Sequence, residues 1–329
     1  MANLFLTTSA EAENLHLRNN ASMTRPFALV LLLLALPALA QDSPGDRPQD
    51  SGTTIRSEVR LVSVFATVTD AAGGPVADLK KEEFHIVEDG QPQQLAIFEQ
   101  ESERPLSIVL AIDTSSSVRK DIKLELESAR KFVKSILRPV DGLSLYQFSE
   151  TVSELVTFTH DLKRINRGID RVSLGSGTAL YDAIYLGGIA LSKRKDRKVM
   201  VVITDGGDTL SAVKYQEAVR SAQQAEAILY SIIVVPVAAS AGRNLGGEHA
   251  LVQLSRDTGG KHYYADSIAS LDEAFAQISK ELRTQYLLAY YPARRSEGPD
   301  FHRIQVSVSR KDAGLQVHHR TGYFTSKLE

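Results

Sequence analysis

The sequence contains no cysteine, and this absence excludes several kinds of site at once. Disulfide bridges, thiolate zinc sites and cysteine nucleophiles all need the thiol group. A bacterial lipoprotein anchor is excluded for the same reason, because it is built on a cysteine. Only oxygen- and nitrogen-bearing side chains are left as candidates for chemistry.

A strong charge of one sign is also lacking. The 38 Lys and Arg residues are balanced by 40 Asp and Glu residues, which leaves a net charge of −2. Nucleic-acid binding usually needs a strongly basic surface, so we expect no nucleic-acid partner. The one basic run, residues 193–198, closes a helical stretch. Cations at a helix C-terminus explain it better than a partner-binding patch does.

The motifs of several enzyme classes are missing. The sequence has no GxSxG elbow, no GxxxxGK[ST] phosphate loop and no HExxH helix. Ser115 has acidic residues but no histidine near it in the sequence, which gives nucleophilic catalysis little support. We therefore expect that the protein is not an enzyme.

One long apolar run stands near the N-terminus. A short positive start at Met23–Pro26 precedes the apolar run Phe27–Leu36, and Ala38-Leu39-Ala40 fits the small-x-small rule. We expect a signal peptide at 23–40, cleaved near Ala40/Gln41, and an exported protein that is periplasmic or secreted. Residues 1–40 would then be dispensable, with Met23 as the start. A retained anchor is the alternative.

The remaining sequence contains no second apolar stretch of transmembrane length. We therefore expect no stable membrane insertion after the signal peptide is removed. Residues 41–56 are polar and rich in Pro, Gly, Ser and Asp, and this composition is typical of a disordered linker.

The two ends of the remaining chain are patterned as β-structure. Residues 57–102 alternate apolar and polar side chains with a period of two, and residues 284–326 return to the same pattern. Three short strands at each end are too few for a stable sandwich. We predict that the two segments pair in one small β-sandwich.

Residues 105–283 alternate apolar runs with amphipathic stretches. The runs Ile108–Ile112 and Val199–Ile203 are continuously apolar, as in strands buried on both faces of a parallel sheet. Helical patterns separate the runs. The predicted fold class is therefore α/β, a doubly wound and mostly parallel sheet of Rossmann-like type, inserted in or flanked by the β-sandwich.

Clusters of oxygen-bearing residues fall where these strands end. Asp113–Ser117 follows one buried strand, Thr204–Asp208 follows the other, and Gly175–Thr178 precedes a helix. In an open parallel sheet, ligands bind beyond the carboxyl ends of the strands. Carboxylates and hydroxyls that converge there suit a hard cation.

This pattern resembles the metal-ion-dependent adhesion site of von Willebrand factor type A (vWA) domains. The matching positions are Asp113, Ser115, Ser117, Thr178 and Asp205. The strings GSGTALYDAI and VVITDGGD also match that family, and the resemblance covers roughly residues 105–283. The flanking strings VTDAAGGPVADLKKEEFHIVEDG and RTGYF resemble a bacterial subfamily of exported vWA-related proteins.

The resemblance implies a role for each residue. Ser115 and Ser117 would bind the ion directly, Asp113 would hold a coordinated water, and Thr178 and Asp205 would supply direct or water-bridged contacts. Few charges among several neutral oxygens favour Mg²⁺ or Mn²⁺ over Ca²⁺. One coordination position would stay free for a carboxylate of a protein partner.

Other polar residues receive structural interpretations. Asp182 and Asp208 are best interpreted as capping residues, and Glu88-Asp89 as part of a hairpin turn. His318 and His319 are neighbours on a predicted strand, so they point to opposite faces and cannot share a metal. The pairs Tyr263-Tyr264 and Tyr290-Tyr291 fit core or edge positions, although one pair could form a contact surface.

Two functions remain open from the sequence, besides an enzyme, which is the third possibility and not the one we expect. The first is an exported adhesion or binding module that depends on a divalent metal ion. The alternative is a cell-envelope scaffold or assembly component whose metal is dispensable. The sequence does not identify the partner, the ion that is bound or the oligomeric state.

Overall fold

The computed structural model of the protein describes residues 61–100, 104–116, 122–235, 245–292, 300–310 and 314–325. The predicted signal peptide, the predicted linker and Ser117 lie outside these ranges, so what was predicted for them stays a prediction. All described residues belong to one of the two compact units of the chain.

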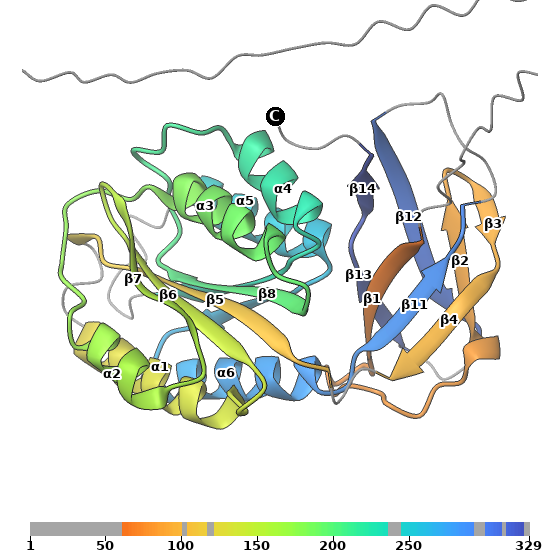
Figure 1. The fold of residues 1–329 in the computed structure, drawn as a ribbon, viewed down its shortest axis with the longest axis horizontal. Helices are drawn as coiled ribbons and strands as arrows, with labels where there is room; N and C mark the ends of the chain where they lie inside the picture. The colour runs from red at the N-terminus through yellow and green to blue at the C-terminus, as the bar shows by residue number, and fades with distance from the viewer. Residues whose placement is uncertain are drawn as a thin grey trace, which may run out of the picture. The chain divides into compact units, whose positions relative to one another are not determined.

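The apolar runs Ile108–Ile112 and Val199–Ile203 form the centre of a six-stranded sheet (Figure 1). Its order is β10-β9-β8-β5-β6-β7, and every neighbouring pair is parallel except β6 and β7. All eight residues of β5 are buried, which requires cover on both faces of the sheet. The strands are β5 (Leu106–Asp113), β6 (Gly142–Phe148), β7 (Val152–Thr159), β8 (Arg197–Thr204), β9 (Ile228–Val234) and β10 (His262–Ala265).

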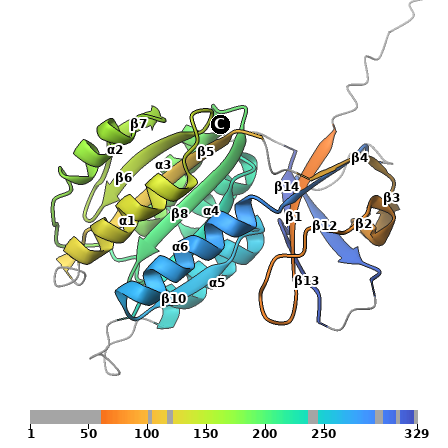
Figure 2. The same cartoon turned by 90° about the horizontal axis from the view of Figure 1, so that it is seen from below.

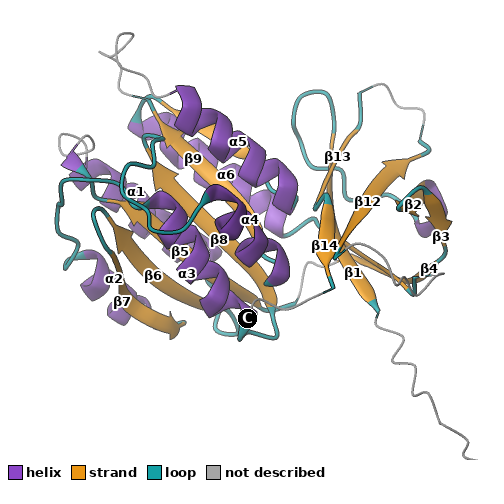
Figure 3. Cartoon of the chain, turned by 90° about the horizontal axis from the view of Figure 1, so that it is seen from above, coloured by secondary structure: helices purple, strands orange, loops and turns teal. Residues whose placement is uncertain are grey.

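Two helical layers supply that cover (Figures 2 and 3). Ile108 and Leu110 of β5 pack in one core with α1 (Ile122–Ile136), α2 (Leu162–Ile169) and α6 (Ile268–Leu282). The intervening Val109 and Ala111 pack in a second core, whose helices are α3 (Leu180–Ser192), α4 (Tyr215–Gln224) and α5 (Leu245–Thr258). Alternate residues of one strand thus face opposite layers, and the predicted doubly wound α/β fold is confirmed.

Strands from the two ends of the chain pair with each other. One sheet has the order β13-β1-β11-β4 and the other β14-β12-β2-β3, so each contains strands from before and after the α/β part. The inward side chains of both sheets share one core, and the β-sandwich is confirmed. The elements are β1 (Val62–Thr69), η1 (Lys81–Glu83), β2 (Phe84–Glu88), β3 (Gln91–Gln93), β4 (Leu95–Gln100), β11 (Tyr286–Tyr290), β12 (Phe301–Val308), β13 (Gln316–His319) and β14 (Gly322–Phe324).

Within the described ranges, each end of the chain contributes four strands rather than the three predicted. The additional strands, β3 and β14, have three residues each, which is too short to show a period of two. The predicted turn before β3 is present. Asp89 and Gly90 have φ angles of 47° and 81°, the left-handed pair that a two-residue hairpin requires.

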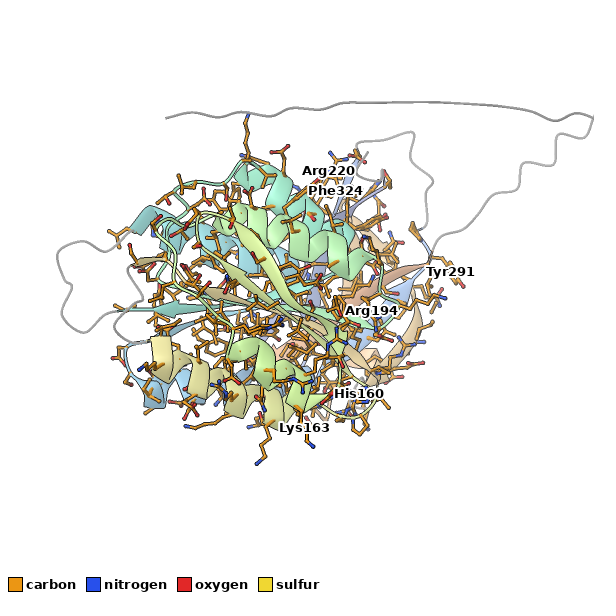
Figure 4. All side chains as sticks on the ribbon, turned by 60° about the vertical axis from the view of Figure 1, so that its left-hand side comes forward. His160, Lys163, Arg194, Arg220, Tyr291 and Phe324 are labelled. Carbon is orange, nitrogen blue, oxygen red and sulfur yellow. The ribbon has the colours of Figure 1, made fainter. Side chains whose placement is uncertain are left out.

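Polar contacts also join the α/β part to the sandwich. On α4, Arg220 forms an ion pair with Asp300 at 2.9 Å, and its guanidinium lies 4.7 Å from the centroid of the Phe324 ring on β14 (Figure 4). The N–H of Thr321 donates to the carbonyl oxygen of Asp257 at 3.0 Å. The two parts therefore meet through specific side chains as well as through the chain connections.

Arg197 is a second such junction, and the helix-terminus interpretation of the basic run is wrong for this residue. Arg197 lies at the start of β8 and is 3% exposed. Its Nη2 donates to the carbonyl oxygen of Leu282 at 2.9 Å and to the Gln285 side chain, next to β11. Its guanidinium also lies 5.5 Å from the ring centroid of Phe65 on β1.

We expect Arg197→Leu to lower the free energy of unfolding by about 3 kcal/mol, because it leaves buried acceptors without their donor. Equilibrium urea unfolding measures the change. Lys195→Ala is the matched control, since Lys195 belongs to the same basic run but is exposed. Its effect should stay within about 0.5 kcal/mol. Equal losses for the two variants would contradict a structural role specific to Arg197.

Candidate functional site

Asp113 is the last residue of β5 and is 1% exposed. Both oxygens of its carboxylate accept hydrogen bonds. Oδ1 accepts the N–H of Ser115 at 2.8 Å, and Oδ2 accepts the hydroxyl of Thr204 at 2.7 Å. The side chain is therefore fixed between the end of its own strand and the end of the neighbouring β8.

Burial raises the pKa of Asp113 to about 6, although the hydrogen bonds from Thr204 and Ser115 oppose the shift. The charge of Asp205 raises the pKa further. A nearby divalent cation would act in the opposite direction and favour the ionised carboxylate. The two carboxylates thus lack a compensating positive charge, which a bound cation would supply.

The loop of residues 175–178 is tied to the end of β5. The N–H of Gly175 donates to the carbonyl oxygen of Thr114 at 2.8 Å. The hydroxyl of Ser116 donates to the carbonyl oxygen of Ser176 at 3.4 Å. The first two oxygen-rich clusters of the sequence are therefore adjacent in the fold.

Thr178 joins this loop to the one that follows β8. Its N–H donates to the Thr209 hydroxyl oxygen at 2.9 Å, and its carbonyl oxygen accepts the N–H groups of Thr209 and Leu210. Thr178 is buried, whereas Asp205, next after the last residue of β8, is half-buried. Residues 113–116, 175–178 and 204–208 thus form one connected surface, which we call the crest.

The structure places four predicted site residues, Asp113, Ser115, Thr178 and Asp205, on the crest. Ser117 lies outside the described residues. The crest contains the ends of β5 and β8, as expected for the carboxyl ends of parallel strands. With hydroxyls, two carboxylates and no sulfur, this set of side chains suits a hard divalent ion.

The crest is also supported from α5. A Cβ atom built at Gly247 would lie 1.4 Å from the carbonyl oxygen of Gly206, so the first turn of α5 packs directly on the backbone that follows Asp205. Only glycine fits this contact. The helix spans Leu245–Thr258.

Asp208 has the capping role predicted for it, whereas Asp182 binds N–H groups of a loop rather than of a helix. Oδ1 of Asp208 accepts the N–H of Tyr181 in the first turn of α3 at 3.2 Å. The carboxylate of Asp182 accepts the N–H groups of Ala212 and Val213 at 3.1 and 2.9 Å. Both carboxylates hold helix and loop termini next to the crest.

The adjacent histidines point to different partners. Nε2 of His319 accepts the N–H of Val306 at 3.1 Å, whereas Nε2 of His318 lies 3.4 Å from the Thr69 hydroxyl oxygen. Burial lowers the pKa of both rings, that of His318 to about 4. Each histidine is thus a neutral packing residue in its own environment at neutral pH, as the sequence indicated.

The tyrosine pairs each divide between core and surface. Tyr290, the last residue of β11, is fully buried, whereas Tyr291, the next residue, is 53% exposed and is labelled in Figure 4. The hydroxyl of Tyr263 donates to Glu281 at 2.8 Å, whereas Tyr264 is 46% exposed.

A second polar cluster was missed by the sequence interpretation. Glu88, Asp89 and His302 each offer one ligand atom, and these atoms lie within 4.8 Å of one another. The sequence assigned the two acids to a turn and gave His302 no role. Asp89 and His302 are 213 positions apart, and no local pattern predicts that β2 pairs with β12.

Solved structures similar to this chain include three proteins with low sequence identity. BatB from Bacteroides thetaiotaomicron is 18% identical, with 54% of this chain and 98% of that chain covered and a TM-score of 0.44. The vWF domain of the type V pili tip protein Mfa5 from Porphyromonas gingivalis is 14% identical, with 60% of this chain and 99% of that chain covered and a TM-score of 0.45. Proximal thread matrix protein 1 from the mussel byssus, with a zinc-occupied MIDAS motif, is 14% identical. The match covers 60% of this chain and 50% of that chain, with a TM-score of 0.48.

No curated protein matches the chain significantly. A protein-family model does match the chain. The von Willebrand factor type A domain matches residues 107–277, just over half of the chain, and these residues run from β5 into α6. The protein belongs to the von Willebrand factor type A domain family.

Proposed function

We propose that the crest binds a divalent cation and that the ion captures a carboxylate of a protein partner. Ser115 and Ser117 would ligate through their hydroxyls, Asp113 would hold a coordinated water, and Thr178 and Asp205 would complete the set directly or through water. The bound ion would supply an incompletely neutralised positive charge, which attracts an anionic group. We expect binding rather than turnover.

One observation carries this proposal. Asp113 is a buried carboxylate at a strand end, its two oxygens are fixed by Ser115 and Thr204, and the charge of Asp205 opposes its ionisation. Placing a buried carboxylate close to a second negative charge is costly unless a cation compensates them. A divalent ion between the two carboxylates would remove that cost.

The proposed ion is Mg²⁺ or Mn²⁺ rather than Ca²⁺. The set contains two carboxylates and three hydroxyls, and small hexacoordinate ions keep several waters beside a few carboxylates. Calcium favours six to eight oxygen ligands in more flexible sites. The fixed position of Asp113 suits the smaller ion.

We also propose that the protein works outside the cytoplasm, as the predicted signal peptide indicates. Among the described residues, no helix combines the length and the apolar composition needed to cross a membrane. The proposed partner is therefore a protein of the cell envelope or the exterior that presents an Asp or Glu side chain.

Water-proton relaxation with bound Mn²⁺ tests the proposal. The full chain should enhance relaxation when it binds Mn²⁺, and excess Mg²⁺ should reverse the effect by competition. Added acetate, a minimal carboxylate, should lower the enhancement because it replaces a coordinated water. Absence of Mn²⁺ binding, or of any response to acetate, would count against metal-mediated capture. Partner binding that survives EDTA would favour the envelope scaffold instead.

A further inference from the structure

The cluster of Glu88, Asp89 and His302 lies in the β-sandwich, on elements that do not contribute to the crest. Glu88 ends β2, Asp89 opens the hairpin turn, and His302 stands on the neighbouring β12. Glu88 pairs with Ile304 in the ladder, so the turn lies alongside His302. One ligand atom from each of the three side chains falls within 4.8 Å of the others.

Glu88 is a carboxylate on the inward face of a sheet and is only 7% exposed. Its Oε2 accepts the hydroxyl groups of Tyr290, on the opposite sheet, and Tyr323. No donor among the described residues reaches Oε1. Oε1 is not among the fully buried oxygens that lack a partner, so it keeps some contact with solvent and is accessible to a ligand. The arrangement leaves one lone-pair-bearing oxygen for a ligand.

The side chains of Asp89 and His302 are also held in place by their neighbours. Oδ2 of Asp89 lies 2.7 Å from Nδ1 of His302, and its Oδ1 accepts the N–H of Arg303 at 2.9 Å. Although burial raises the pKa of Asp89, these bonds outweigh it and lower the pKa overall. The His302 ring is 5% exposed and stacks on Tyr323, with centroids 5.2 Å apart. Metal ligands are typically fixed by such neighbours.

We propose that Glu88, Asp89 and His302 form a second metal site, which binds a divalent transition-metal ion of the Zn²⁺ class. One imidazole nitrogen with two carboxylate oxygens is a ligand set that suits Zn²⁺, whereas Mg²⁺ and Ca²⁺ take oxygen ligands. Two carboxylates with a neutral histidine carry a charge of −2, which the ion would balance. Water would fill the remaining position.

Asp89 and His302 need only a small adjustment to share one ion. Ligand bonds to Zn²⁺ are about 2.0–2.2 Å long, so an oxygen and a nitrogen on one ion lie roughly 3.0–3.4 Å apart. The present distance of 2.7 Å between Asp89 and His302 must therefore increase by a few tenths of an ångström. The side chain of Asp89 is 43% exposed and has room to move, while His302 stays packed. The ion would fasten the β2–β3 turn to β12.

Zinc titration of the full chain in excess Mg²⁺ tests this site, because excess Mg²⁺ competes with Zn²⁺ for the hard-ion site on the crest. Isothermal titration calorimetry should give one Zn²⁺ per chain. His302→Phe keeps the aromatic stack and removes the ligand, and it should weaken Zn²⁺ binding at least a hundredfold. Co²⁺ in place of Zn²⁺ should give visible absorption bands that the variant lacks.

Two further variants keep the test decisive if His302→Phe fails to fold. Glu88→Gln can still accept the tyrosine hydroxyls, and it should weaken Zn²⁺ binding at least tenfold. His85→Ala is the matched control, since His85 lies on the same strand with its side chain exposed. No Zn²⁺ binding in excess Mg²⁺, or equal binding by folded Glu88→Gln and wild type, would overturn the site. Asp113→Ala should leave it intact, so the two metal proposals can fail separately.

Discussion

Asp113→Ala is expected to weaken Mg²⁺ binding at least a hundredfold, because it removes the carboxylate that the ends of β5 and β8 fix in place. Calorimetric titration measures this loss. Mg²⁺ at a hundred times its Kd should raise the free energy of unfolding of the wild type by about 2.7 kcal/mol. The same addition should leave the variant unchanged.

Asp113→Asn separates metal binding from folding. The raised pKa means that the folded state opposes the charge of Asp113, so at pH 7 this charge lowers the stability of the metal-free protein. Asparagine carries no charge and can still accept one of the two hydrogen bonds. We expect the free energy of unfolding of metal-free Asp113→Asn to lie within about 1 kcal/mol of the wild-type value or above it. The variant should bind no Mg²⁺.

Asp208→Asn is the matched control for both variants. Asp208 stands on the same crest loop as Asp205, but its carboxylate bonds to Tyr181 and Ser211. We expect Mg²⁺ affinity within a few fold of the wild type. A loss as large as that of Asp113→Ala would mean that general disruption of the loop, rather than removal of a ligand, explains the result.

The sequence predicts the α/β part well because its signals are local. A strand with both faces buried is mostly apolar, so the central residues of β5 and β8 are visible as continuous runs. The crest follows from them, since residues directly after parallel strands meet at one edge. The short helix α2 was not predicted. It is nevertheless capped by Asp161, which accepts the N–H groups of Lys163 and Arg164.

The cluster at the end of the sandwich could not be predicted in this way. Its residues come together only through the register of β2 with β12, and register depends on tertiary packing. Arg197 shows the same limit. Its basic neighbours are a local pattern, whereas its acceptors Leu282 and Gln285 lie more than 80 positions away. Contacts between distant segments require the fold itself.

Gly247→Ala is expected to damage the crest without removing any ligand. The added methyl group would overlap the carbonyl oxygen of Gly206, so α5 or the loop after Asp205 must move. Because a backbone oxygen cannot rotate away as a side chain can, we expect a loss of about 2–4 kcal/mol in the free energy of unfolding. We also expect Mg²⁺ affinity to fall at least tenfold.

Gly246→Ala isolates this contact from the general effect of placing alanine in a helix. Gly246 is the preceding residue of α5 and is exposed. Alanine is the better helix former by up to about 1 kcal/mol, so this variant should be as stable as the wild type or more stable. Urea unfolding and Mg²⁺ calorimetry on both variants give the comparison. If Gly247→Ala bound Mg²⁺ as the wild type does, the position of Asp205 would not depend on the packing of α5. The crest would then be held by the ends of β5 and β8 alone.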